Sequence, residues 1–274
     1  MKQTTIITFS ILLGLSLLLN IVSLVSVSNM YDKLMLVKPV ISNAQKVPKI
    51  IKQYNQMMGQ FHYLCGIEAK KSGDTEIAMK NFNEALHYNA DVYLVNFQIG
   101  MMHFENNEFE KALGFATKEK ANNPTHARNL CLIGSIHSEW KNWEDAIKSY
   151  DEALLYDPLN YFATQNAAEI YRIMGLPNQA KELLDTYLTK QPDSLFEFKR
   201  QMALISLGRS REVEAFLSNK TGVASVEQDI LQCAVQYKNG DIERAQDSCK
   251  KALEKDEGIT KQYMQDPLFK GFGL

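Results

Sequence analysis

The sequence predicts an all-α protein, in which a superhelix of antiparallel helix pairs follows a single transmembrane helix. Three observations predict it: an uncharged apolar stretch near the amino terminus, small residues and prolines that return at one regular interval, and few turn formers. The 274 residues are 45% hydrophobic and 23% charged, the balance of a folded chain. With only 14 Gly and 7 Pro, an all-β sandwich or barrel is disfavoured. The net charge of −2 gives no attraction to nucleic acid, so no such partner is expected.

Residues 1–27 are predicted to hold the transmembrane helix. Residues 3–31 contain no charged side chain, and residues 6–27 are predominantly Ile, Leu, Val and Phe. At about 1.5 Å per residue this run is about 33 Å long, enough to span the hydrocarbon core of a bilayer. It also exceeds the apolar core of a cleaved secretory signal. The alternative is cleavage after Ser28, where Ser26 and Ser28 form a small-x-small site, and release of a secreted or periplasmic soluble factor.

The sequence does not decide on which side of the membrane the rest of the chain lies. Lys2 precedes the apolar run, and Lys33, Lys38 and Lys46 follow it. This count leans slightly toward a cytoplasmic carboxy-terminal domain. A short amino-terminal tail before a single anchor more often stays inside, which points the other way. The prediction is therefore a single-pass membrane protein of undecided sidedness.

Residues 28–57 are predicted to form a linker that becomes a capping helix. Pro39 and Pro48 limit regular structure in the middle of the segment, and Pro48 suits the first turn of a helix. The apolar residues after Pro48 fall on one helix face: Ile50, Ile51, Tyr54, Met57 and Met58. We expect this helix to cover the next element, and an amphipathic helix that binds a partner is the alternative.

A period of thirty-four positions governs most of the remaining chain. It is kept by three series: Gly66, Gly100 and Gly134; Ala78, Ala112, Ala146 and Ala180; and Pro124, Pro158 and Pro192. A glycine inside a helix costs about 1 kcal/mol relative to alanine, so close packing must require it. We expect each glycine, and the alanine twelve positions later, to let two antiparallel helices approach closely. The proline then ends the second helix.

These units resemble tetratricopeptide repeats. The unit at residues 127–160 matches that pattern best, with Gly134, Trp143, Ala146, Tyr150, Ala153 and Pro158 in register. The units at 59–92 and 161–194 match it as well. The unit at 93–126 departs from it, because Ala116 replaces an aromatic residue and Glu119 replaces a small one.

Beyond Pro192 the repeat becomes shorter. The interval from Ala180 to Ala245 falls about three positions short of two full periods, which indicates that one unit has lost those residues. We therefore expect five to six repeats over residues 58–257. A capping tail over residues 258–274 is expected to cover the last helix with Tyr263, Met264, Leu268 and Phe269.

The resemblance implies a concave groove, lined by the first helix of each unit, that holds peptides or partner helices. The positions that it places in the groove combine aromatic residues with a few charges, as protein-binding surfaces do. They are Tyr63, Lys70, Phe97, Met101, Phe104, Arg128, Phe162 and Arg172. For Phe97, Phe104 and Phe162, packing between units is the alternative. Tyr63 and Ile67 replace the Lys and Asn with which some members of the family bind the acidic end of chaperones, so no such clamp is expected.

No catalytic, metal-binding or phosphate-binding motif is present, so we expect neither an enzyme nor a cofactor. His103 and His137 lie one period apart, and we interpret them as packing residues, with a metal pair as the alternative. The cysteines fall at interior helix positions, as buried small hydrophobic residues do. They are Cys65, Cys131, Cys233 and Cys249. Cys233 and Cys249 could instead form a bridge in an oxidising compartment, because they lie on facing helices of one unit.

The sequence thus predicts a membrane-anchored scaffold that binds partner proteins or peptides through its groove and contacts the lipid bilayer through its amino-terminal helix. A tether of this kind raises the effective concentration of a captured partner.

Overall fold

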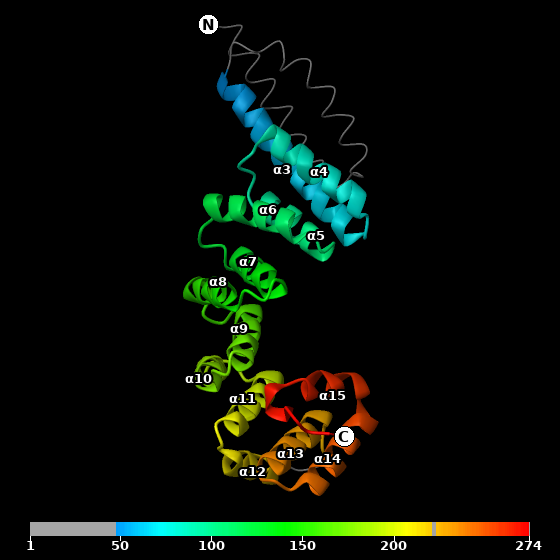
Figure 1. Cartoon of the computed structure of the whole chain (residues 1–274). Coiled ribbons are helices and arrows are strands. Elements are labelled where there is room, and N and C mark those ends of the chain that lie inside the picture. Colours follow the sequence, from blue (N-terminus) through cyan, green and yellow to red (C-terminus); the bar gives the residue numbers. More distant parts are fainter. Residues whose placement is uncertain (1–47, 221–222, 274) are drawn as a thin grey trace, which may run out of the picture. The chain divides into compact units, whose positions relative to one another are not determined.

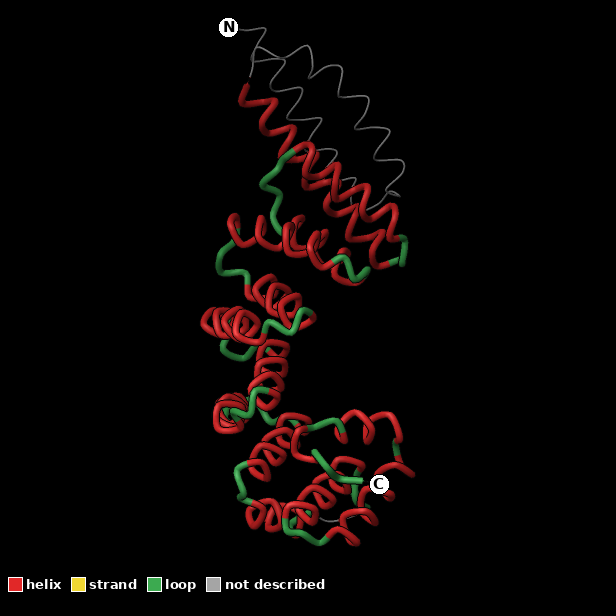
Figure 2. The backbone as a smooth tube through the Cα atoms, viewed as in Figure 1, coloured by secondary structure: helices red, strands yellow, loops and turns green. Residues whose placement is uncertain are grey.

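A computed structural model describes residues 48–220 and 223–273 of the chain (Figure 1). These residues form helices joined by short loops, and none of them forms a strand (Figure 2). The all-α prediction is confirmed for this part of the chain. The transmembrane helix predicted at residues 1–27 and most of the linker predicted at 28–57 lie outside the described residues. Within the described ranges, no helix combines the length and the hydropathy needed to span a membrane.

The chain divides into two compact units at the boundary between Asn122 and Asn123. From Pro48 onward, where the structure describes it, unit 1 consists of two antiparallel helix pairs. They are α3 (Pro48–Lys71) with α4 (Thr75–Tyr88), and α5 (Val95–Glu105) with α6 (Phe109–Asn122).

Unit 2 consists of four helix pairs and a short tail. The pairs are α7 (Ala127–Glu139) with α8 (Trp143–Tyr156), α9 (Tyr161–Ile173) with α10 (Pro177–Leu188), α11 (Ser194–Ser206) with α12 (Ser210–Ser218), and α13 (Val226–Lys238) with α14 (Ile242–Lys255). The tail contains α15 (Glu257–Met264) and the 3₁₀ helix η1 (Pro267–Phe269).

The predicted capping helix and the first helix of the repeats are one continuous helix, α3. Its apolar face does not break near residue 58, where the sequence predicts the boundary between the two. Tyr54, Met58, Phe61 and Cys65 recur at helical spacing and are 0–7% exposed. Because the same face is buried on both sides of the expected boundary, nothing ends the helix there.

A glycine and an aromatic ring set the approach of the helices in two of the pairs. A Cβ atom on Gly66 would lie 2.5 Å from the ring of Phe82, and one on Gly134 would lie 2.8 Å from the ring of Tyr150. Such distances leave no room for a side chain, so the expectation that close packing requires these glycines is confirmed. The helices do not meet without a side chain between them, however, because the ring sixteen positions later lies against each glycine.

A residue in the left-handed conformation lies in the turn inside each of the six pairs described above. These residues are Gly73, Asn107, Lys141, Gly175, Gly208 and Gly240. The first four keep the full period, the interval from Gly175 to Gly208 is one position shorter, and the interval from Gly208 to Gly240 is two positions shorter. The loss is therefore shared by two repeats, and the expectation that one repeat lost all three residues is wrong.

Replacing Lys141 with glycine should stabilise unit 2. Lys141 has φ 59°, a conformation that is costly for a residue with a Cβ atom. Its N–H donates to Ser138 O over 2.9 Å, and this bond does not depend on the side chain. The cost of the Cβ atom exceeds the entropy cost of glycine by about 0.5–1 kcal/mol, so Lys141→Gly should raise the melting temperature by about 2 °C.

Gly175→Ala is the matched control, because it makes the reverse change at the same turn position of the next repeat. A Cβ atom on Gly175 would meet nothing within 4 Å, so its effect comes from the backbone alone. Thermal unfolding followed by circular dichroism should show a lower melting temperature for this variant. A Lys141→Gly chain no more stable than the wild type would contradict the assignment of strain.

Candidate functional site

Half-exposed side chains of α3 and α5 form a mixed surface in unit 1. On α3 they follow i, i+4, i+7 spacing, and on α5 they follow i, i+3, i+7 spacing, so each set lies on one side of its helix. We call this surface the α3–α5 face, and its residues are Tyr63, Ile67, Lys70, Gln98, Met101 and Glu105.

Two contacts join the helices across the α3–α5 face. Lys70 Nζ lies 3.2 Å from Glu105 Oε1, and Gln98 on α5 is close enough to the Tyr63 hydroxyl on α3 to lower its pKa slightly. Burial raises the pKa of Tyr63, with smaller contributions from Tyr93 and Glu119, so this phenol is neutral at physiological pH. The face thus offers a phenol, a thioether and one exposed pair of opposite charges.

Three of the residues that the sequence places in the groove of unit 1 lie together on this face: Tyr63, Lys70 and Met101. The other two contribute to packing. Phe97 is only 9% exposed, and the ring of Phe104 lies 5.5 Å from the ring of Phe109, between α5 and α6.

The three groove residues predicted in unit 2 are in different surroundings. Arg128 is exposed, and Phe162 is 67% exposed beside the ring of Tyr161. Arg172 is covered, because its guanidinium pairs with Asp266 of the tail and with Glu169 on its own helix. No sequence signal could have found the pair with Asp266, since the two residues are far apart in the chain and Asp266 lies outside the repeat pattern.

The two histidines that lie one period apart each pack beside an aromatic ring. His103 Nδ1 lies 2.5 Å from Glu108 Oε2, and its ring stacks on Phe115 at 5.4 Å. The ring of His137 meets the edge of Trp140 at 5.9 Å. Within the described part of the chain, no group of three or more His, Cys, Asp or Glu side chains is placed to hold a metal ion.

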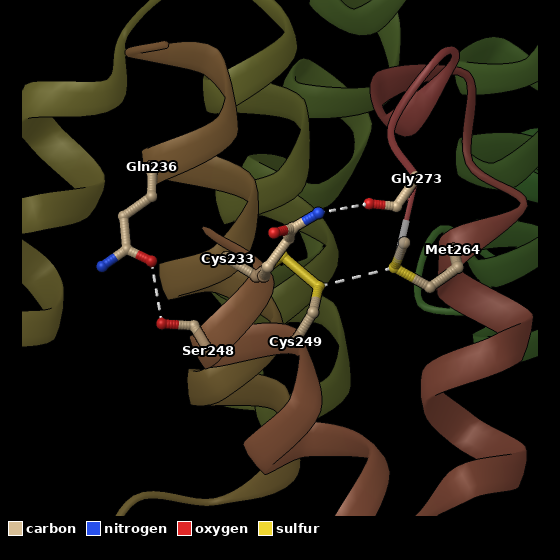
Figure 3. The surroundings of a disulfide bond; sticks show 7 residues. Cys233, Gln236, Ser248, Cys249, Met264 and Gly273 are labelled. Carbon is tan, nitrogen blue, oxygen red and sulfur yellow. Dashed lines mark hydrogen bonds between the residues drawn. A yellow bond between two sulfur atoms is a disulfide. The ribbon is translucent and has the colours of Figure 1, made fainter. Parts of the chain in front are cut away.

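A disulfide links Cys233 on α13 to Cys249 on α14 (Figure 3). The prediction that Cys233 and Cys249 are simply buried small residues is therefore wrong, and the alternative prediction of a bridge between them is confirmed. Both residues are fully buried, and Cys249 Sγ lies 3.5 Å from Met264 Sδ on α15. The separation of sixteen positions equals that of Gly66 and Phe82, so a covalent bond replaces the packing of a ring on a glycine.

Cys65 and Cys131 are buried free thiols. Burial raises the pKa of Cys65 to about 11 and that of Cys131 to about 12. At neutral pH both therefore remain thiols, and because only the thiolate is a good nucleophile, neither is reactive in the folded protein.

Comparison with known proteins agrees with the fold. Residues 127–158 match the tetratricopeptide repeat family model. The solved structure of pilF from Pseudomonas aeruginosa has a TM-score of 0.58 and 18% identity, covering 77% of this chain and 98% of that chain. PilW, described as a widely conserved type IV pilus biogenesis factor, has a TM-score of 0.56 and 16% identity, covering 72% of this chain and 92% of that chain.

A third similar structure is YrrB, described as a TPR protein with an unusual peptide-binding site. It has a TM-score of 0.53 and 16% identity, and the match covers 67% of this chain and 97% of that chain. Identities this low show the fold alone. The chain therefore has the helical-repeat fold of tetratricopeptide repeat proteins, as the resemblance implied.

The cysteines give a direct test of the disulfide. The folded, unreduced protein should show almost no thiol toward Ellman's reagent at about pH 8, because Cys65 and Cys131 are buried and protonated. After denaturation without reductant, two thiols per chain should react. After reduction all four cysteines should react, and four thiols before reduction would show that the bridge is absent.

Proposed function

We propose that this protein is a membrane-tethered adaptor that binds partner proteins or peptides through its α3–α5 face. The observation that carries the proposal is the exposed Lys70–Glu105 pair beside the half-exposed Tyr63 and Met101. A Lys–Glu pair with 28% and 48% exposed side chains is weakly held, so its charges can turn to a ligand at little cost. A phenol and a flexible thioether supply adaptable apolar contact around it.

The fold supports this proposal by analogy. YrrB has a similar fold and is described as having a peptide-binding site, and PilW is described as a pilus biogenesis factor. Those descriptions concern those proteins, and what they lend to this chain is a precedent for binding by stacked helix pairs. Since no catalytic motif is found in the sequence, binding is the activity that the surface supports best.

The buried disulfide supports an oxidising location for the repeats. Disulfides form and persist in secreted, periplasmic and surface proteins and are rare in the cytosol. Because both sulfur atoms are buried inside the α13–α14 pair, this bridge serves structure and not exchange. We therefore propose that the repeat domain lies outside the cytosol and the amino terminus inside, although the lysine count leans slightly toward the opposite orientation. Release as a secreted or periplasmic factor after cleavage is the second candidate, and the disulfide supports it equally.

A double substitution tests the α3–α5 face. Tyr63→Ala with Met101→Ala removes the apolar contacts on both helices and should reduce partner recovery at least tenfold, equivalent to about 1.4 kcal/mol. Recovery is measured by quantitative pull-down with the full chain in detergent. Leu64→Ala is the matched control, since Leu64 is a 49% exposed neighbour of Tyr63 outside this face. An equal loss of partner recovery in both variants, or no loss in either, would contradict the assignment of the α3–α5 face as the binding surface.

A reporter fused after Leu274 tests the location. An enzyme that is active only outside the cytosol, as alkaline phosphatase is, should be active in intact cells, because the disulfide needs an oxidising compartment. A reporter active only in the cytosol would contradict the proposed sidedness. Amino-terminal sequencing of the mature chain then separates the two candidates: Met1 is expected for the anchored form, and a start near Asn29 for the secreted one.

A further inference from the structure

The residues that follow α14 turn back along unit 2 and reach a helix two pairs earlier (Figure 1). The ring of Tyr263 meets the ring of Phe198 on α11 edge to face, with 4.8 Å between their centroids. Beyond it, Asp266 pairs with Arg172 on α9. The tail therefore covers more than the last helix, which is the element that the sequence predicts it to cover.

Asp266 ends a line of alternating charges. Its carboxylate pairs with Arg172, Arg172 pairs with Glu169, and Glu169 Oε2 lies 3.5 Å from Lys199 Nζ on α11. The side chains of Asp266, Arg172 and Lys199 are 2%, 11% and 11% exposed. Two cations face one carboxylate on the helices, so α9 and α11 present one excess positive charge to the tail.

The pKa directions fit a site built around charged groups. Burial raises the pKa of Asp266, and Arg172 offsets only part of this effect. Burial also lowers the pKa of Lys199, with Glu169 opposing the change. Burial alone would raise the pKa of Glu169, but Arg172 and Lys199 together hold it below its usual value.

Two large apolar residues follow the buried carboxylate at once. Asp266 Oδ1 accepts from Leu268 N–H over 2.7 Å, which fixes the turn of η1. Leu268 and Phe269 are then 6% and 3% exposed within the core shared with α11 and α13. The hydroxyl of Tyr237 on α13 donates to Lys270 O over 3.0 Å. One charged anchor and two apolar anchors within a single short segment are the features by which a short peptide is held in a groove.

A cap that only shielded apolar surface would not need Asp266. Burying a carboxylate is costly unless it is paired, and a buried pair adds more specificity than stability. The tail also leaves space, because a cavity of about 200 Å³ beside Asp266 and Pro267 is lined by Arg172, Lys238 and Ser206.

We propose that residues 266–269 are a built-in ligand, and that the surface they cover on α9, α11 and α13 is a second binding site. Its external ligand is a partner segment with an acidic residue followed within three positions by two large apolar residues. The wild-type tail holds the site closed until such a segment displaces it. This inference rests on the proposed function as a protein-binding adaptor, but it concerns unit 2 and not the α3–α5 face.

The experiment adds a separate peptide that copies the tail to the full-length protein in detergent. The probe is a fluorescent peptide with the sequence of residues 261–273, and anisotropy reports binding. The wild-type chain should not bind it at micromolar concentrations, because its own tail competes at high effective concentration. Asp266→Asn weakens the tail and leaves the acceptor intact, so this chain should bind the peptide. Glu257→Gln, which removes an exposed pair with Lys261 in the same tail, should behave as the wild type.

Further variants separate docking from a structural role. A chain with both Asp266→Asn and Arg172→Gln should lose peptide binding at least tenfold relative to Asp266→Asn alone, because the acceptor is gone. A peptide carrying the Asp266→Asn change should bind the Asp266→Asn chain at least tenfold more weakly than the wild-type peptide. Hydrogen exchange should show faster exchange of residues 257–273 in the Asp266→Asn chain and not in the Glu257→Gln chain.

Three results would overturn the proposal: no peptide binding to a folded Asp266→Asn chain, equal binding after Arg172→Gln is added, or unchanged exchange of the tail. If Asp266→Asn prevents folding, Leu268→Ala weakens the tail without touching the buried charges and should show the same gain of peptide binding. The peptide is the chain's own sequence, so the test needs no partner. A Tyr63→Ala, Met101→Ala chain should give wild-type results, which separates failure here from failure of the α3–α5 face.

Discussion

One contact between residues sixteen positions apart sets the distance between the two helices of several pairs. Where the first residue is Gly66 or Gly134, an aromatic ring fills the space above the helix backbone. Where it is Cys233, a covalent bond to Cys249 takes the place of the ring. Because helix pairs of one geometry can stack at a regular interval, this short distance is the condition on which the repeat depends. The surface on α3 follows from it, since the packing of Gly66 on Phe82 decides which side of that helix is left for other contacts.

The period made the fold predictable from the sequence. Glycine and alanine recur because the helices pack closely at those positions, and proline recurs because it ends the second helix. The continuity of α3 was predictable as well, since the apolar face from Tyr54 to Cys65 never changes phase. The Asp266–Arg172 pair was not, because nothing in the local sequence of either residue specifies a partner so far along the chain. The aromatic residues of α5 show the same limit: spacing puts Phe97 and Phe104 near the face occupied by Met101, and only packing shows that Phe97 is buried.

The disulfide lies where a repeat array needs it. A terminal pair has a neighbour on one side only, so it gains less from stacking than an internal pair. A cross-link between residues sixteen positions apart adds about 3 kcal/mol in the chain-entropy account of disulfides. The tail adds to this, because Gln246 Nε2 donates to Gly273 O over 2.9 Å and Phe269 is buried in the same core. The disulfide therefore ties α14 to α13, the helix that contributes Lys238 beside Asp266.

The two candidate surfaces differ in what a ligand must supply. On the α3–α5 face the Lys70–Glu105 pair is exposed, and water can solvate either charge if the pair separates, so a ligand adds its contacts to those present. At Arg172 the pair is buried, and removing Asp266 without replacement would leave the two cations Arg172 and Lys199 with Glu169 as their one shared carboxylate. A ligand can enter there only by exchange, carboxylate for carboxylate. The first surface therefore suits weak and varied partners, whereas the second selects for one charged group at one position.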